Sequence, residues 1–161
     1  MRSFSNLWYW IVLAVLWSTV SHWVLGVPFD LVQRAAQNPQ AESDLETLVG
    51  INIRRLLYID DRAGILLWAL AFFVLTLLAI TGFIYHFEFS QAVGFLAFPL
   101  CIVAIMSALT ARRIDEQSLS GEDLRKQLKR LRFYIQCLGM AAIFTTSIFG
   151  MFQNLVIGVR G

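Results

Sequence analysis

Two histidines, His22 and His86, are the residues of this chain most suited to hold a cofactor. An imidazole in an apolar segment can ligate a metal or a porphyrin, and ionisable groups in such segments are candidates for function. His22 lies near the end of one apolar stretch, and His86 lies at the end of another. We expect them at opposite sides of a membrane, so they cannot ligate one metal or one haem together.

His22 is the better candidate for a cofactor ligand. Ser18 precedes it by one helical turn, and a small residue there would let a flat macrocycle approach the helix. Trp17 and Trp23 flank it. One hypothesis is a haem or bacteriochlorophyll with His22 as its single ligand. The alternative, which we prefer, is a histidine that is hydrogen-bonded at the interface or to a neighbouring helix, with no cofactor.

Motifs for catalysis are absent from the sequence. It contains no GxxxxGK(S/T), HExxH, GxSxG or CxxC pattern. Cys101 and Cys137 lie in apolar stretches at depths about 9 Å apart, so we expect two packed thiols rather than a disulfide. No acidic residue falls inside an expected membrane span, which argues against a proton or cation relay. We therefore expect no enzymatic activity and no catalytic residue.

The composition indicates a helical membrane protein. Of 161 residues, 58% are hydrophobic and 15% are charged, whereas a soluble domain carries about 25% charged residues. The apolar blocks are long enough to cross a hydrocarbon core of about 30 Å. The sequence predicts one all-α membrane domain with four transmembrane helices, at about 7–27, 64–85, 91–111 and 133–159. Two cytoplasmic segments, 29–62 and 112–132, are each predicted to contain an amphipathic helix.

Basic residues orient the predicted spans. Seven of the thirteen Lys and Arg residues lie in the segment 111–133, and short basic loops stay in the cytoplasm. Both termini and the turn at 86–90 are then expected outside, in a bacterial inner membrane. The basic side chains of this segment are predicted to contact lipid headgroups. They are Arg112, Arg113, Arg125, Lys126, Lys129, Arg130 and Arg132.

The first cytoplasmic segment is predicted to form a helix after Asn38-Pro39. Five residues recur there at spacings of four and three, which places them on one helical face. They are Leu45, Val49, Asn52, Leu56 and Ile59. The sequence leaves open whether this helix continues into the second span, because Asp60-Asp61 could interrupt it.

The second cytoplasmic segment is predicted to begin a long helix that runs to Val159, with Ser120 as its N-cap and Asp123 at N3. Leucines on one face form a seam, which we expect to pack in parallel on the helix at 45–59, or on a partner subunit. Small residues further along favour helix packing in lipid. The predicted interaction residues are Leu124, Leu128, Leu131, Gly139, Ala142, Thr146 and Gly150.

The stretch RSFSNLWYWIVLAVLWSTVSHWVLGVPFDLVQRA resembles the start of an inner-membrane protein family of Rhodobacter-like alphaproteobacteria. The resemblance extends through NIRRLLYI and TARRI. Members of that family carry the label "component of SufBCD complex", which refers to iron–sulfur cluster assembly. The resemblance implies a bacterium rich in respiratory, and often photosynthetic, membrane complexes. It also implies that the chain could anchor assembly machinery at the membrane.

Three functions of different classes agree with these features. The first is a non-catalytic accessory or scaffold subunit of a larger respiratory or photosynthetic complex, with other integral membrane subunits as partners. The second is an anchor that recruits a soluble cytoplasmic partner, such as iron–sulfur assembly machinery. The third is a cofactor-binding or small transport protein centred on His22. Neither nucleic acid nor a small-molecule substrate is expected as a partner. We prefer the first, because the chain is small, lacks catalytic motifs and carries packing stripes.

Overall fold

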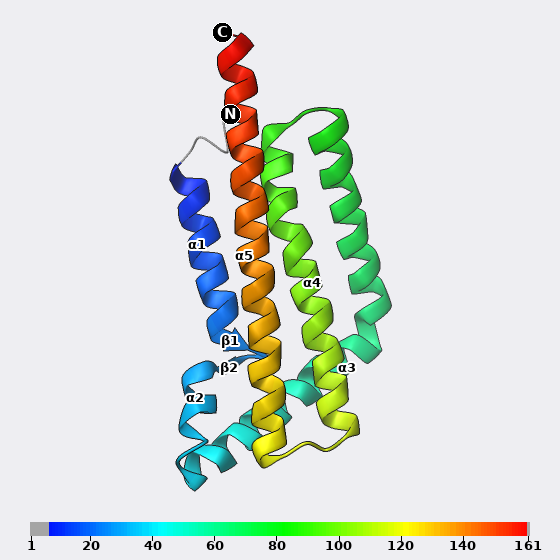
Figure 1. Ribbon diagram of the computed structural model, residues 1–161. Helices are drawn as coiled ribbons and strands as arrows, with labels where there is room; N and C mark the ends of the chain where they lie inside the picture. The colour runs from blue at the N-terminus through cyan, green and yellow to red at the C-terminus, as the bar shows by residue number, and fades with distance from the viewer. Residues whose placement is uncertain (1–6, 161) are drawn as a thin grey trace.

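The computed structural model describes residues 7–160, and the side chains of residues 7–152 and 155. Figure 1 shows an elongated helical bundle in which the long helices run side by side, with a short transverse part beneath them. The elements are α1 (Leu7–His22), β1 (Trp23–Val24), β2 (Val27–Pro28), α2 (Phe29–Arg34), α3 (Pro39–Ala79), the π-helical turn η1 (Ile80–Ile84), α4 (Glu88–Glu116) and α5 (Gly121–Arg160).

Three helices in the described part of the chain are long and apolar enough to cross a membrane. They are α3 with η1, α4, and α5 as far as Phe152. α1 is apolar but has 16 residues, or about 24 Å of helix, which is less than the hydrocarbon core. The all-α class is therefore confirmed, and the described residues include three helices that could cross a membrane, whereas four spans were predicted.

The first predicted span is too long at its C-terminal end. α1 ends at His22 rather than at residue 27, because β1 and β2 pair as a small antiparallel hairpin. Leu25 and Gly26 at its turn have φ angles of 52° and 73°, the left-handed values that two-residue hairpin turns require. Asn52 Nδ2 donates a hydrogen bond of 3.2 Å to the Gly26 carbonyl oxygen, which attaches the hairpin to α3.

One continuous helix, α3, joins the predicted first cytoplasmic segment to the predicted second span. Its N-cap is Asn38, whose side chain accepts a hydrogen bond of 2.9 Å from the Gln40 N–H. Pro39 follows in the first turn of the helix, where a backbone N–H has no partner within the helix, so its absence costs no hydrogen bond. Figure 1 shows that α3 bends sharply, so that its first half crosses beneath the bundle and its second half rises beside α4.

The lower end of the bundle has its own hydrophobic core. We call this part the foot; it comprises residues 23–59 and 114–135, from the hairpin, α2, the first half of α3, and the adjoining ends of α4 and α5. Side chains from each of these elements are almost fully buried in one cluster. They include Val24, Val27, Phe29, Val32, Leu45, Val49, Ile53, Ile114, Leu124, Leu128 and Leu131.

The predicted parallel contact between the two amphipathic helices is wrong. Figure 1 shows the first half of α3 crossing the lower end of α5 transversely. The bend in α3 causes this geometry, since a helix that turned straight upward would have run beside α5. The five residues predicted to share its apolar face differ in burial: Leu45 and Val49 are buried, Asn52 and Leu56 are half-buried, and Ile59 is exposed.

The upper ends of α3 and α4 meet through the π-helical turn. Gln91 is buried, and its Nε2 donates a hydrogen bond of 2.8 Å to the carbonyl oxygen of Gly82. A Cβ atom at Gly82 would lie 3.1 Å from the Gln91 backbone nitrogen, so the absence of a side chain lets the two helices approach. His86, with φ of 56°, reverses the chain between them.

Candidate functional site

The leucine seam is buried inside the chain itself. Leu124, Leu128 and Leu131 are 2%, 0% and 2% exposed, and they belong to the same core cluster as the buried residues of α3 and the hairpin. Burial of a leucine stabilises a fold by about 1.5–3 kcal/mol, which explains why α5 continues below the apolar part of the molecule. The seam therefore holds the foot to the bundle and is not a free surface for a partner.

The stripe of small residues on α5 also faces the interior. Gly139, Ala142, Thr146 and Gly150 are all buried. A Cβ atom at Gly139 would lie 2.8 Å from Cε3 of Trp17, so α1 packs against α5 where α5 has no side chain. Helices in lipid approach closely at such small residues. This stripe accounts for packing within the chain.

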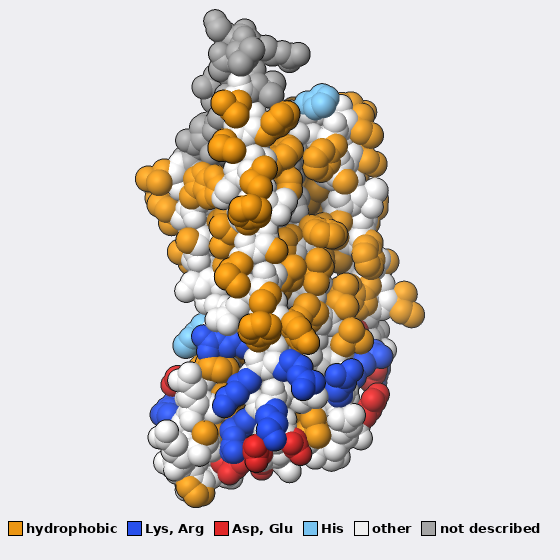
Figure 2. Space-filling model, in the orientation of Figure 1, with side chains coloured by type: hydrophobic (Ala, Val, Ile, Leu, Met, Phe, Trp, Pro, Cys, Tyr) orange, Lys and Arg blue, Asp and Glu red, His pale blue; other side chains and the backbone are white. Residues whose placement is uncertain are grey.

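The basic residues form a belt at the boundary between the apolar bundle and the foot. Figure 2 shows Lys and Arg side chains directly below a broad hydrophobic band. Of the seven residues predicted to contact headgroups, three are exposed and make no ion pair with any described residue. These are Arg113, Lys129 and Arg130, whereas Lys126 is exposed but lies 2.9 Å from the Glu122 carboxylate. A belt at this position suits contact with phosphate groups of lipids.

Two other arginines of the belt stabilise the foot. Arg125 Nη1 donates to the carboxylate of Glu42 and, at 3.1 Å, to the carbonyl oxygen of Ala35. The guanidinium carbon of Arg132 lies 3.6 Å from the centre of the Phe29 ring, a cation–π geometry. Their charges are used to join α5 to α2 and α3, so the prediction of headgroup contact fits them least.

The start of α5 is capped by a residue of α3. The helix begins directly after Ser120, as predicted, but the Gly121 N–H donates to Oε1 of Glu46 at 2.6 Å. Within the described residues the Ser120 side chain makes no hydrogen bond. A carboxylate at a helix N-terminus is favoured by the helix dipole, and here it also ties two helices together.

His22 lies on the surface at the lower end of α1. Its ring packs edge-on against Trp23, with 6.0 Å between the ring centres, and the side chain is exposed. Ser18 is exposed on the same helix, whereas Trp17 points inward to Gly139. His86 lies in the turn at the other end of the bundle. The structure thus keeps the histidines apart, and a macrocycle at His22 remains the alternative hypothesis, with a cofactor-free histidine as the prediction.

No group of three or more His, Cys, Asp or Glu side chains among the described residues could hold a metal ion. Cys101 and Cys137 are both free thiols and half-buried.

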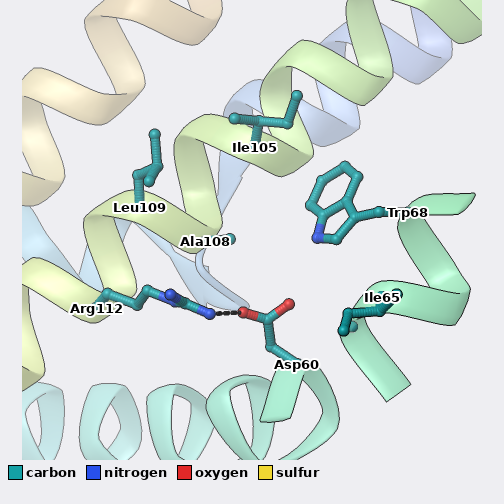
Figure 3. Close-up of a pocket in the computed structure, with 8 residues that line it drawn as sticks. Asp60, Ile65, Trp68, Ile105, Ala108, Leu109 and Arg112 are labelled. Carbon is teal, nitrogen blue, oxygen red and sulfur yellow. Dashed lines mark hydrogen bonds and ion pairs between the residues drawn. The ribbon is translucent and has the colours of Figure 1, made fainter. Parts of the chain in front are cut away.

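A groove lies beside the bend of α3, at the level of the belt. It has a volume of about 500 Å³ and lies between α3 and α4. Arg112 Nη2 donates to Oδ2 of Asp60 at 2.5 Å, and the pair forms one end of the groove (Figure 3). The rest of the lining is apolar, with Ile65, Trp68, Ile105 and Leu109 around it.

This ion pair was missed from the sequence. The two residues are 52 positions apart, and each was assigned to a separate role, Arg112 to lipid headgroups and Asp60 to a helix break. Their positions relative to the membrane could have revealed the pair. Asp60 lies just before one expected span and Arg112 directly follows the next, and a tight hairpin links those two spans.

Comparisons of the chain with protein-family models, with curated proteins and with solved structures gave no match.

Proposed function

We propose that this chain is a non-catalytic accessory subunit of a larger respiratory or photosynthetic complex in a bacterial inner membrane. In this proposal it has four spans, with α1 as the fourth and both termini outside. α1 is short for a span, but it packs along α5 through Gly139. Its role is to present a membrane surface to other subunits.

The observation that carries the proposal is the isolated position of the second half of α3. Only 6% of its most apolar window is buried, compared with 17% for α4 and 22% for α5. Figure 1 shows this half at the edge of the bundle, beside α4. Grooves of about 380 and 460 Å³ lie along its contact with α4, at its lower and upper parts. A helix from another subunit would fill these grooves and cover α3.

The seam and the small stripe on α5 do not support the proposal, because both are used inside the chain. The partner surface is therefore expected on α3 rather than on α5. Leu70 is 56% exposed on α3, and Phe144 is 67% exposed on α5, so these two positions make a matched pair for crosslinking.

The test is photo-crosslinking in native membranes, with a crosslinking amino acid at position 70 or at position 144, followed by mass spectrometry. We expect position 70 to give an adduct with an integral subunit of a respiratory or photosynthetic complex, and position 144 to give little or none. A chain that forms no protein adduct from either position and elutes alone from a mild detergent would contradict the proposal.

A second candidate, an anchor for a soluble partner, is favoured by apolar side chains on the foot. Ile51 and Tyr58 are 49% and 62% exposed on the first half of α3. Under this reading Ile51 and Tyr58, rather than Leu70, would crosslink, and the adduct would be a soluble protein. The resemblance to the family labelled with iron–sulfur assembly makes such machinery the first partner to examine.

A further inference from the structure

The groove at the Asp60–Arg112 pair combines opposite charges with an apolar wall. Ile105 and Leu109 belong to the two turns of α4 that precede Arg112, so the wall extends about 10 Å away from the pair. Ile65 is 91% exposed and Leu109 is 62% exposed, which means that the groove is open at its sides. Its volume of about 500 Å³ falls in the range of ligand sites, about 300–1,000 Å³.

Polar groups in the groove retain unused hydrogen-bonding capacity. Arg112 binds Oδ2 of Asp60, and Figure 3 shows the other carboxylate oxygen turned toward the groove. A Cβ atom at Gly64 would lie 2.6 Å from that oxygen, so a glycine is what leaves it room. Figure 3 also shows the indole nitrogen of Trp68 facing the groove, and it makes no hydrogen bond to any described residue.

The depth of the groove matches the headgroup layer of a bilayer. Arg112 lies where α4 leaves its apolar part, and the belt of Lys and Arg in Figure 2 lies directly below the hydrophobic band. At that depth a ligand can place a charged group against the ion pair and a hydrocarbon chain against α4. The side chains of Asp60 and Arg112 are 15% and 52% exposed, so both can be reached.

We propose that this groove binds one molecule of an ethanolamine phospholipid. Its ammonium group would donate to the free oxygen of Asp60, and its phosphate would accept from Arg112. The Trp68 N–H would donate to an ester or phosphate oxygen, and one acyl chain would lie along Ile105 and Leu109. The groove presents the Asp60 carboxylate beside the Arg112 guanidinium, so the complementary headgroup is one that carries both an ammonium and a phosphate.

Other phospholipids fit the same groove less well. A choline headgroup carries no N–H to donate to Asp60. An anionic glycerol headgroup brings its phosphate to Arg112 but offers no cation to the carboxylate. A hydrogen bond to a charged group contributes enough to change affinity by about tenfold or more, so selectivity for ethanolamine should be measurable.

The test is native mass spectrometry of delipidated protein with equal amounts of ethanolamine, choline and glycerol phospholipids of identical acyl chains. We expect the ethanolamine lipid to be retained about tenfold more than the choline lipid. Asp60→Asn should abolish this preference, and Trp68→Phe should weaken retention of the ethanolamine lipid. Asp44→Asn makes the same chemical change at an exposed acid of α3 outside the groove and serves as the matched control, with the preference unchanged.

Equal retention of the three lipids by the wild-type chain would overturn the proposal, as would stronger retention of the glycerol lipid. If the preference survives both Asp60→Asn and Trp68→Phe, the lipid site lies outside this groove, and the proposal is overturned too. If Asp60→Asn does not fold, Trp68→Phe and the comparison of headgroups on the wild-type chain decide the result. Loss of the crosslink at Leu70 would bear on the proposed function alone.

Discussion

The ring of Trp17 fills the space that a side chain at Gly139 would need, because a Cβ atom there would lie 2.8 Å from Cε3 of the indole. This contact fixes α1 against α5. It explains why a tryptophan in the middle of a short apolar helix is buried while most of its neighbours are exposed.

Gly139→Ala is therefore expected to weaken the packing of α1 on α5. Overpacking of this kind costs about 1–3 kcal/mol, and the midpoint of thermal unfolding in mild detergent measures it. Gly50→Ala is the control, because nothing lies within 4 Å of a Cβ atom there. That control should be neutral or slightly stabilising, since alanine is the better helix former. Equal melting of the two variants would mean that α1 does not dock at Gly139.

Leu128→Ala is expected to destabilise the foot by about 2–5 kcal/mol, since the side chain is fully buried and its removal leaves a cavity. Ile51→Ala, on an exposed position of α3, is the matched control and should change stability by less than about 0.5 kcal/mol. Limited proteolysis of the segments 29–62 and 112–132 reports opening of the foot. If Leu128→Ala leaves proteolysis unchanged but releases a partner, the seam faces that partner instead.

Glu46→Ala should loosen the first turn of α5. The variant removes the acceptor of the Gly121 N–H and a charge near the helix N-terminus, together worth about 1 kcal/mol. Hydrogen exchange of residues 121–124 should become faster, while the membrane part of α5 stays protected. Asp44→Ala removes an exposed acid from the same helix and should leave exchange in α5 as it is. Faster exchange in both variants would point to a general charge effect.

His22→Ala is expected to leave an assembled, colourless protein, as the wild type should be. The imidazole is exposed and its ring contact is with Trp23 at the surface, so its loss should cost less than about 0.5 kcal/mol. The absorption spectrum between the near ultraviolet and the near infrared is the measurement. A porphyrin or chlorin band in the wild type that the variant lacks would make His22 an axial ligand.

Reporter fusions test the proposed topology. Fusions after Ser90 and after Gly161 should report an external position, and a fusion after Gln117 a cytoplasmic one, because the basic belt stays inside. A reporter at the amino terminus separates three spans from four. It should be external if α1 crosses the membrane and cytoplasmic if α1 does not.

Much of the fold was predictable because helices leave a local pattern. Asn38 and Pro39 mark the start of α3, and the leucine spacing after Ser120 marks the buried face of α5. The hairpin was not predictable in this way, since two-residue strands have no periodicity; Gly26 was its one signal. The direction in which α3 crosses α5 and the pairing of Asp60 with Arg112 depend on the bend of α3, which the spacing of residues does not encode.

The foot has a consequence for biosynthesis. Its hairpin, α2 and the first half of α3 are made early, but Leu124, Leu128 and Leu131 leave the ribosome only after the second and third spans have been synthesised. Until then Val24, Val32, Val49 and their neighbours lack the residues that cover them, and exposed apolar side chains are recognised by proteases and chaperones. A chain that stops before α5 should therefore be degraded rather than accumulate. Only chains that contain α5 should persist in the cell.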